Sequence, residues 1–424
     1  MSSPPAWLLV AAASAIGVAL PLYAWRARGR TFAIYSAVLV TIAFPAAVGL
    51  GLRLDALSVQ HGLPGVGWLF LYAIVASGFH LSLLVRARMR DRLYRYAVSI
   101  PGQALIALGT ICVPYFALAL PIAGLLQLVG ATSAVAALRW LDLLPLIIVL
   151  ASLATSMRLR REVVRFELAG DEPETVSRLP VTRHFRGAPA LAQRPLRLVQ
   201  ITDPHLGPWQ PVHRLRSRVE ELLRHQPDLV LLTGDFLTME GNGTPGALAA
   251  ALEPLSRAPG RCFAIFGNHD HEAAEEVRSG LAANNIQLLV DEVACADTPV
   301  GPVQILGADY YRKERDQQLQ ALLREHPRRA DHLRLLLLHD PLGFRDIPKG
   351  EADLVLSGHT HGGQVGLVSL GLDWTVLSRS RWPDHGLFGH GPNRLYVHRG
   401  TGFYGFPLRI GVPGEASLLE VVLS

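Results

Sequence analysis

The chain has 424 residues, half of them apolar, with a mean hydropathy of +0.27 and a formal net charge of +5. This length leaves room for two domains. The net positive charge comes from three short arginine clusters. It therefore indicates the edge of a membrane and not a groove that binds nucleic acid. The three cysteines have no paired spacing, which excludes a disulfide framework and a zinc-thiolate site.

Apolar segments dominate the first part of the chain. Most of them are near the ~20 residues that a spanning helix needs. No small-residue cleavage site follows the first segment, which argues against a removed signal peptide. The sequence therefore predicts an all-α transmembrane helical domain at residues 1–157 with about five spans. The segments are Ala6–Trp25, Phe32–Leu52, Gly67–Val85, Val98–Gly130 and Leu141–Met157.

The arginine clusters predict which side of the membrane each end of a span faces. They lie at residues 26–30, 86–95 and 158–165, and the opposite loops carry a single arginine each. By the positive-inside bias the clusters face the cytoplasm. We therefore expect an integral protein of a bacterial inner membrane, with the C-terminal domain on the cytoplasmic face. Two spans within 98–138, split at Pro121, would instead place that domain outside.

Two polar residues lie in the apolar half. His80 falls inside the third segment, where an ionisable group is often functional. One histidine without a partner favours a packing role instead, because a neutral imidazole can bond a neighbouring helix. Asp142, near the start of the last segment, is expected at the membrane interface.

After Met157 the composition becomes that of a soluble α/β protein. Residues 158–195 are expected to be a linker with an entering edge element. From Leu196 onward, short apolar runs alternate with amphipathic stretches at 215–224 and 317–324, which predicts an α/β sheet packed between helices. Two late strands indicate a second sheet. The expected strands are 196–202, 229–233, 262–266, 303–307, 333–338, 354–357, 394–398 and 417–422.

Polar side chains directly follow several of these strands, at the edge where open α/β sheets bind ligands. Asp203 and His205 stand two residues apart, a spacing that aims both side chains the same way in extended chain. Asp235 follows Gly234, and its two oxygens could bridge two ions. The later strands are followed by Asn268, His269, His339, His359 and His361.

Imidazole, carboxylate and amide groups without thiolates suit Zn, Mn or Fe. The groups that follow the strands exceed in number the needs of one tetrahedral ion and fit two ions that share a bridge, the arrangement used in phosphoryl hydrolysis. We therefore expect two divalent transition-metal ions (Mn, Zn or Fe) as cofactors. The candidate donors are Asp203, His205, Asp235, Asn268, His269, His339, His359 and His361.

The blocks Asp-x-His, Gly-Asp, Gly-Asn-His-Asp, His and Gly-His-x-His, in this order, resemble the calcineurin-like metallophosphoesterases. The resemblance covers residues 196–424 and departs at Pro204, where a larger apolar residue is more usual. Residues 358–364 and 395–409 resemble the membrane-associated branch, whose members often carry N-terminal membrane segments. The resemblance implies a four-layer α/β/β/α sandwich at 196–424, preceded by the transmembrane helical domain.

The same resemblance implies roles for the site residues. Asp203, His205, Asp235 and His361 would hold one ion. Asp235, Asn268, His339 and His359 would hold the second. His269 would lie outside both sets, face the phosphate and either stabilise charge or protonate the leaving oxygen. Asp270 would orient His269.

The expected function is hydrolysis of a phosphate monoester, diester or pyrophosphate by a metal-bound hydroxide. A lipid-linked substrate would explain the anchor, so the expected partners are that substrate and membrane lipids, with no nucleic acid. One alternative is a membrane transporter or sensor whose phosphoesterase-like domain is regulatory; paired intramembrane charges would support it. Another is a catalytically silent binding module, which loss of a metal ligand would favour, and no ligand of the motif is missing.

Overall fold

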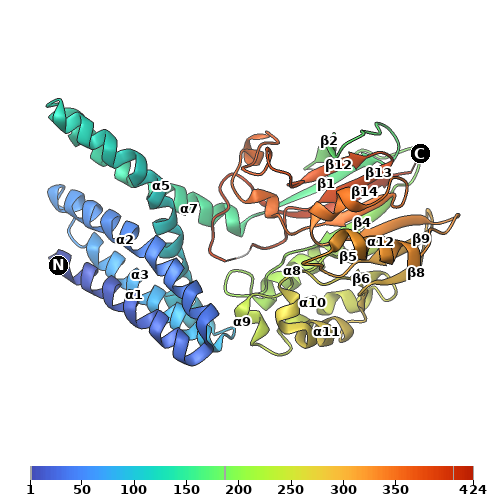
Figure 1. The fold of residues 1–424 in the computed structure, drawn as a ribbon, viewed down its shortest axis with the longest axis horizontal. Coiled ribbons are helices and arrows are strands. Elements are labelled where there is room, and N and C mark those ends of the chain that lie inside the picture. Colours follow the sequence, from blue (N-terminus) through green and yellow to red (C-terminus); the bar gives the residue numbers. More distant parts are fainter. Residues whose placement is uncertain (1, 186–187, 404, 424) are drawn as a thin grey trace. The chain divides into compact units, whose positions relative to one another are not determined.

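The computed structural model describes residues 2–185, 188–403 and 405–423. The chain divides into two compact units, one of helices and one built on two sheets, and each is described by itself (Figure 1). The helical unit comprises Met1–Ala154 with Gly405–Leu408, and the sandwich unit comprises Thr155–Tyr404 with Arg409–Ser424.

Among the residues that the structure describes, five helical stretches are long and apolar enough to cross a membrane: Ala6–Arg28, Arg30–Gln60, Val66–Arg86, Arg92–Leu128 and Thr132–Met157. They correspond to the five segments expected from the sequence. Pro121, the dividing point of the two-span alternative for residues 98–138, lies inside one continuous helix, α5 (Ile100–Leu128), as does Pro114. The other elements are α1 (Ala6–Arg28), α2 (Arg30–Gln60), α3 (Val66–Leu83), η1 (Leu84–Arg86), α4 (Arg92–Tyr94), η2 (Arg95–Ser99), α6 (Thr132–Leu138), η3 (Arg139–Asp142) and α7 (Leu143–Met157).

Small residues allow these helices to pack closely. A Cβ on Gly109 of α5 would lie 2.1 Å from the carbonyl oxygen of Ala43 in α2, so only glycine fits there. Where α5 meets α3, Gln103 Nε2 lies 2.7 Å from His80 Nε2. The amide donates and the ring accepts, which gives His80 the helix-packing role expected from the sequence.

An ion pair joins the start of α7 to two other helices. Arg53 Nε of α2 lies 2.9 Å from Asp142 Oδ2, and the Tyr115 hydroxyl of α5 donates to Asp142 Oδ1 at 2.7 Å. Asp142 is only 2% exposed, so its charge is balanced by these neighbours rather than by solvent. The three side chains satisfy one another, which suits a role in fastening the helices.

Two seven-stranded sheets form the middle of the sandwich unit. The order in the first sheet is β3-β1-β14-β4-β5-β6-β7, and in the second it is β2-β12-β13-β11-β10-β9-β8. The strands are β1 (Leu159–Glu167), β2 (Ser177–Leu179), β3 (Thr182–His184), β4 (Leu196–Ile201), β5 (Leu229–Leu232), β6 (Cys262–Ala264), β7 (Gln287–Leu288), β8 (Glu292–Thr298), β9 (Gly301–Gly307), β10 (Leu333–Leu337), β11 (Leu354–Ser357), β12 (Gly386–His390), β13 (Asn393–Val397) and β14 (Gly414–Val422).

The segment expected to be a linker with an entering edge element contributes strands to both sheets. Strand β1 pairs in parallel with β14 along its whole length, from Leu159 opposite Gly414 to Glu167 opposite Val422. Strand β3 covers the other side of β1, and β2 extends the second sheet beside β12. Residues 158–185 therefore belong to the sandwich, because β1 buries apolar side chains on a strand contributed by the other end of the chain.

A hydrophobic core fills the space between the sheets, and helices cover their outer faces (Figure 1). Leu335 and Leu337 of β10 face this core, whereas Leu336 faces the outer cluster with α12 (Arg315–Glu325), as the two-residue period of a strand requires. The expected four layers are thus present. The remaining helices are α8 (Val212–Leu223), α9 (Met239–Asn242), α10 (Ala247–Leu252) and α11 (Ala274–Ala282), with short turns η4 (Glu253–Arg257), η5 (Asp270–Ala273), η6 (Pro341–Asp346), η7 (His361–Gly363) and η8 (Val368–Leu370).

Candidate metal centre

The expected ligands come together because they follow parallel strands. In the first sheet β4, β5 and β6 are parallel neighbours, and in the second β10 and β11 are. Their carboxyl ends therefore meet along one edge of each sheet. The loops that leave these ends carry Asp203 and His205 (after β4), Asp235 (after β5), Asn268 and His269 (after β6), His339 (after β10), and His359 and His361 (after β11).

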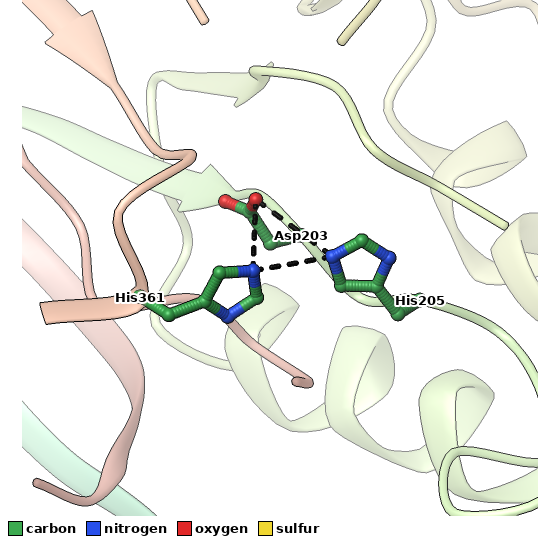
Figure 2. A group of neighbouring side chains, drawn as sticks. All are labelled: Asp203, His205 and His361. Atoms are coloured by element: carbon green, nitrogen blue, oxygen red, sulfur yellow. Dashed lines mark hydrogen bonds and ion pairs between the residues drawn. The ribbon is translucent and has the colours of Figure 1, made fainter. Parts of the chain in front are cut away.

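One group of donors consists of Asp203, His205 and His361, whose side chains point toward one another (Figure 2). His361 Nε2 lies 3.3 Å from Asp203 Oδ1 and 3.2 Å from His205 Nε2. The third distance, from Asp203 Oδ1 to His205 Nε2, is 3.9 Å. All three residues are buried. Three convergent donors of this kind fit a divalent transition metal.

A second group consists of Asp235, His339 and His359. His339 Nε2 lies 3.3 Å from Asp235 Oδ2, 3.2 Å from His359 Nδ1 and 3.2 Å from Asn268 Oδ1. The other ring nitrogen of His339, Nδ1, lies 2.7 Å from the carbonyl oxygen of Thr233. That hydrogen bond places the proton on Nδ1 and leaves the Nε2 lone pair for a cation.

Asp235 faces both groups. Its Oδ2 atom lies 3.9 Å from His205 Nε2 in the first group and 3.3 Å from His339 Nε2 in the second. Its Oδ1 atom accepts the backbone N–H of His269 at 2.9 Å. The carboxylate is therefore held in place by the backbone while one oxygen is directed between the two donor groups.

Strained backbone accompanies these ligands. Asp203, His205, Asp235, His359 and His361 have φ of 48°, 46°, 58°, 66° and 52°, in the left-handed region that non-glycine residues rarely adopt. Such strain persists only where the surrounding structure holds it, and it clusters at functional sites.

Glycines allow the ligand loops to approach one another. A Cβ on Gly358 would lie 2.1 Å from Thr202 Oγ1 and 2.2 Å from Asp203 Oδ2. A Cβ on Gly234 would lie 2.3 Å from the backbone nitrogen of Gly267. Substituting either glycine would push two ligand loops apart.

The buried charges of the site perturb one another. Burial opposes the charge of Asp203, but His361 and His205 hold the pKa of this carboxyl well below its usual range. Burial lowers the pKa of His205 to about 3, which keeps its ring neutral. Burial also opposes the charge of His339, but Asp235 raises the pKa of this ring to about 10. His205 thus stays neutral, whereas His339 carries a positive charge that Asp235 attracts and that a bound cation would replace.

His269 lies beside the donor groups rather than within either of them. Its ring centroid is 5.9 Å from that of His205, and its side chain is 23% exposed, so solvent and small solutes can reach it. His269 Nδ1 lies 3.1 Å from Glu272 Oε1. Burial lowers the pKa of His269, but the hydrogen bond to Glu272 and the charge of Asp235 outweigh burial and raise it above its usual value.

The Asp270 carboxylate, which was expected to orient His269, contacts backbone groups in the structure. Its carboxylate accepts three backbone N–H groups, from Asp235 at 2.7 Å, Phe236 at 2.8 Å and Gly267 at 2.7 Å. It therefore ties the loop after β5 to the loop after β6. The acidic partner that the structure gives the His269 ring is Glu272, which the motif alone did not single out.

Two further side chains lie at the site that the sequence did not predict to be there. Arg409 is fully buried, and its Nη1 donates to the His361 carbonyl oxygen at 3.1 Å while Nη2 donates to the carbonyls of Arg399 and Gly402. Trp382 stacks on the His359 ring with centroids 5.4 Å apart. A lone arginine and a lone tryptophan carry no local pattern, so only their position in space connects them with the ligands.

Comparisons with known proteins agree with this geometry. The family described as calcineurin-like phosphoesterase matches residues 196–363. An uncharacterized metallophosphoesterase of Helicobacter pylori is 30% identical over 232 residues, covering 54% of this chain and 60% of that protein. The uncharacterized metallophosphoesterase YkoQ of Bacillus subtilis is 30% identical over 242 residues, covering 54% of this chain and 85% of that protein. The phosphodiesterase YaeI of Escherichia coli is 28% identical over 235 residues, covering 54% and 83%.

The two sheets and their paired donor groups define a phosphoesterase fold that is built to hold divalent cations. This chain belongs to the calcineurin-like metallophosphoesterase family. It adds five apolar helices, which associate it with a membrane. The chain spans about 60% of the length of the Helicobacter pylori relative.

Proposed function

We propose that this protein is an integral membrane hydrolase that cleaves a phosphate monoester, diester or pyrophosphate, lipid-linked substrates included, with two divalent metal ions. The observation that carries the proposal is the position of Asp235 Oδ2, within 3.9 Å of a donor atom in each group. A carboxylate in that position offsets the repulsion between two cations a few ångströms apart.

The ligand assignment follows the two donor groups. Asp203, His205 and His361 hold one ion, and His339, His359 and Asn268 hold the other, with Asp235 shared between them. When bound, such a pair of Mn, Zn or Fe ions activates water and neutralises the charge of a phosphoryl group. The name of the Escherichia coli relative, a phosphodiesterase, supports phosphodiesters as the first substrates to test.

His269 is proposed to stabilise charge on the phosphate or to protonate the leaving oxygen. It lies next to Asn268 in the chain, beside both donor groups, and it is open to solvent. Glu272 contacts Nδ1, and the proposed role requires that Nε2 face the substrate. Asp270 supports this arrangement indirectly by holding the two loops together.

The proposed location of the catalytic domain is the cytoplasmic face of a bacterial inner membrane. The arginine clusters at 26–30, 86–95 and 158–165 support this side, because cytoplasmic loops are enriched in such residues. Five spans also require that the two ends of the helical unit face opposite sides.

The test uses the full chain purified in detergent. Metal content is measured together with hydrolysis of a panel of chromogenic phosphomonoesters, phosphodiesters and pyrophosphates, before and after chelation. We expect about two ions per chain and activity that chelation abolishes and Mn, Zn or Fe restores. The same measurements are made on Asp235→Asn, which neutralises the shared ligand. The matched control is Asp297→Asn, which neutralises an exposed carboxylate on β8. A folded, metal-loaded protein that hydrolyses no member of the panel would favour the silent binding module.

A further inference from the structure

The sandwich unit carries an apolar projection beside the metal centre. Residues 366–376, which we call the finger, fold back on themselves, with Gly366 bridged to Thr375 and the Leu367 N–H donating to the Trp374 carbonyl at 2.8 Å. Of the eight large apolar side chains that are exposed among the described residues of the sandwich unit, five lie in the finger. They are Leu367 (39% exposed), Leu370 (75%), Leu372 (52%), Trp374 (45%) and Val376 (51%).

This concentration is unusual for a surface in water. Single exposed apolar residues are common, but a contiguous group of them marks a binding surface. The finger is held firmly at its base, because Thr375 Oγ1 donates to Asp384 Oδ2 at 2.5 Å and the Gly366 N–H donates to the Ile410 carbonyl at 2.9 Å. Its apolar side chains are therefore presented to the surroundings by a fixed backbone.

The finger lies next to the point where the chain leaves its last apolar helix. Helix α7 ends at Met157, and Arg160, three residues later, donates from Nη1 to the Val368 carbonyl at 3.2 Å. Three residues of extended chain span at most about 11 Å. The Arg160 guanidinium also lies 5.1 Å from the ring of Phe185, another exposed apolar side chain. The apolar surface thus begins within a few residues of a membrane span.

Cationic side chains flank the apolar ones. Arg379 and Arg381 are exposed just after the finger, and Arg160 belongs to the basic cluster at 158–165. The finger also contains one carboxylate, Asp373, whose Oδ1 lies 3.7 Å from His385 Nε2. Apolar side chains with arginines at their base are the pattern of a surface that enters the boundary of a bilayer and attracts anionic headgroups.

The base of the finger is also part of the metal centre. Thr360, between the ligands His359 and His361, donates to the Asp384 carbonyl at 2.6 Å, and the Asp384 side chain holds Thr375 of the finger. A Cβ on Gly363, two residues after His361, would meet Leu377 and Val376 at 3.1–3.2 Å. A phosphate at the ligands would therefore lie a short distance from apolar side chains.

We propose that the finger inserts into the bilayer interface, so that the metal centre acts on phosphoesters whose apolar part remains in the membrane. The proposed membrane contact does not depend on the proposed function, whereas the proposed substrate class rests on it. The occupant of the finger surface is the lipid boundary, with its acyl chains against Leu370 and Leu372 and its anionic headgroups against the flanking arginines.

The membrane contact is tested with the full chain in liposomes. Cys112 and Cys262 are buried and Cys295 is exposed on β8, so a polarity-sensitive fluorophore can be placed at position 370 in a Leu370→Cys, Cys295→Ser chain. We expect nitroxide-carrying lipids to quench this label and aqueous iodide to leave it bright. The same fluorophore on the native Cys295 is the control and should show the opposite response.

Two results would overturn the membrane contact. Quenching of the label at 370 by iodide and not by lipid nitroxides would mean that the finger is in water. Protection from both quenchers would mean that protein covers it, either the helical unit or a second copy of the chain.

The substrate class is tested with the double variant Leu370→Ser, Leu372→Ser, with Leu191→Ser as a control at an exposed leucine outside the finger. Each leucine removed from a lipid environment weakens partitioning by roughly tenfold. We expect hydrolysis of a phosphodiester lipid in bilayers to fall roughly tenfold or more, while a water-soluble phosphodiester is cleaved as before. An equal change for both substrates would refute the lipid-borne class. If wild-type protein cleaves neither ester, the proposed function fails, and the fluorescence experiment still decides the membrane contact.

Discussion

Phe166 of β1 provides the sharpest test of how the sandwich unit is built. Its side chain is 4% exposed, lies in the core between the sheets and stacks on Tyr396 of β13 with ring centroids 5.8 Å apart. If residues 158–195 were a linker, Phe166→Ala would cost little. Because the ring fills a packed core, we expect the free energy of unfolding to fall by about 3–5 kcal/mol.

The matched control is Phe185→Ala, which removes the same side chain from the same segment at a site that is 57% exposed. Exposed substitutions change the free energy of unfolding by about 0.5 kcal/mol or less. With about 2–4 °C per kcal/mol for a domain of this size, Phe166→Ala should lower the melting temperature by roughly 6–20 °C and Phe185→Ala by at most about 2 °C.

A thiol-reactive dye can follow unfolding of the sandwich unit in detergent. Cys262 on β6 is 2% exposed and reacts only when the core opens. The other two cysteines, Cys112 and Cys295, are first replaced by alanine and serine. Equal melting temperatures for Phe166→Ala and Phe185→Ala would refute the place of β1 in the core. A fragment that begins at Leu196 lacks β1 altogether, so the shortest stable catalytic fragment should begin near Thr155 instead.

Three further outcomes follow from the site and the membrane half. Asp235→Asn should lose bound metal and hydrolytic activity together, as measured by metal analysis and an activity assay. His269→Ala should keep its metal and slow turnover by ~10²–10⁴-fold, with a smaller decrease for substrates that have good leaving groups. Loss of metal in both variants would refute the separate role of His269. Arg409→Met should weaken metal binding by ~10–100-fold, because the His361 carbonyl would lose the hydrogen bond that holds this ligand loop. A metal titration with a competing chelator measures the affinity, and an unchanged affinity would show that the buried guanidinium is only structural. Reporter fusions after Arg165 should be active only with a cytoplasmic reporter, and activity of an export-dependent reporter would reverse the topology.

Much of the molecule could be predicted from the sequence because the relevant signals are local. The break in composition near Met157 separates the two units, since a spanning helix must be apolar along its length. Strands buried on both faces read as continuous apolar runs, and the polar residues that follow them lie at the carboxyl ends of the strands. The position of Asp203, His205 and His361 at strand ends follows from those two facts, whereas their meeting requires that the two sheets stack with these edges together.

The remaining features depend on contacts between residues far apart in the chain. Strand β1 is a core strand only because it pairs with β14, some 250 residues later in the chain. No local pattern within residues 159–167 predicts that pairing. Asp270 and Glu272 are both acidic neighbours of His269, and only the folding of the loops after β5 and β6 directs one to backbone N–H groups and the other to the ring. The exposure of the finger could not be predicted from the sequence for the same reason. Its leucines have the composition of a core segment, and only the tertiary structure shows that they are exposed near Arg160. Local patterns determine which residues can take part in a strand or a site, whereas burial and pairing are decided by the partners that the whole fold brings together.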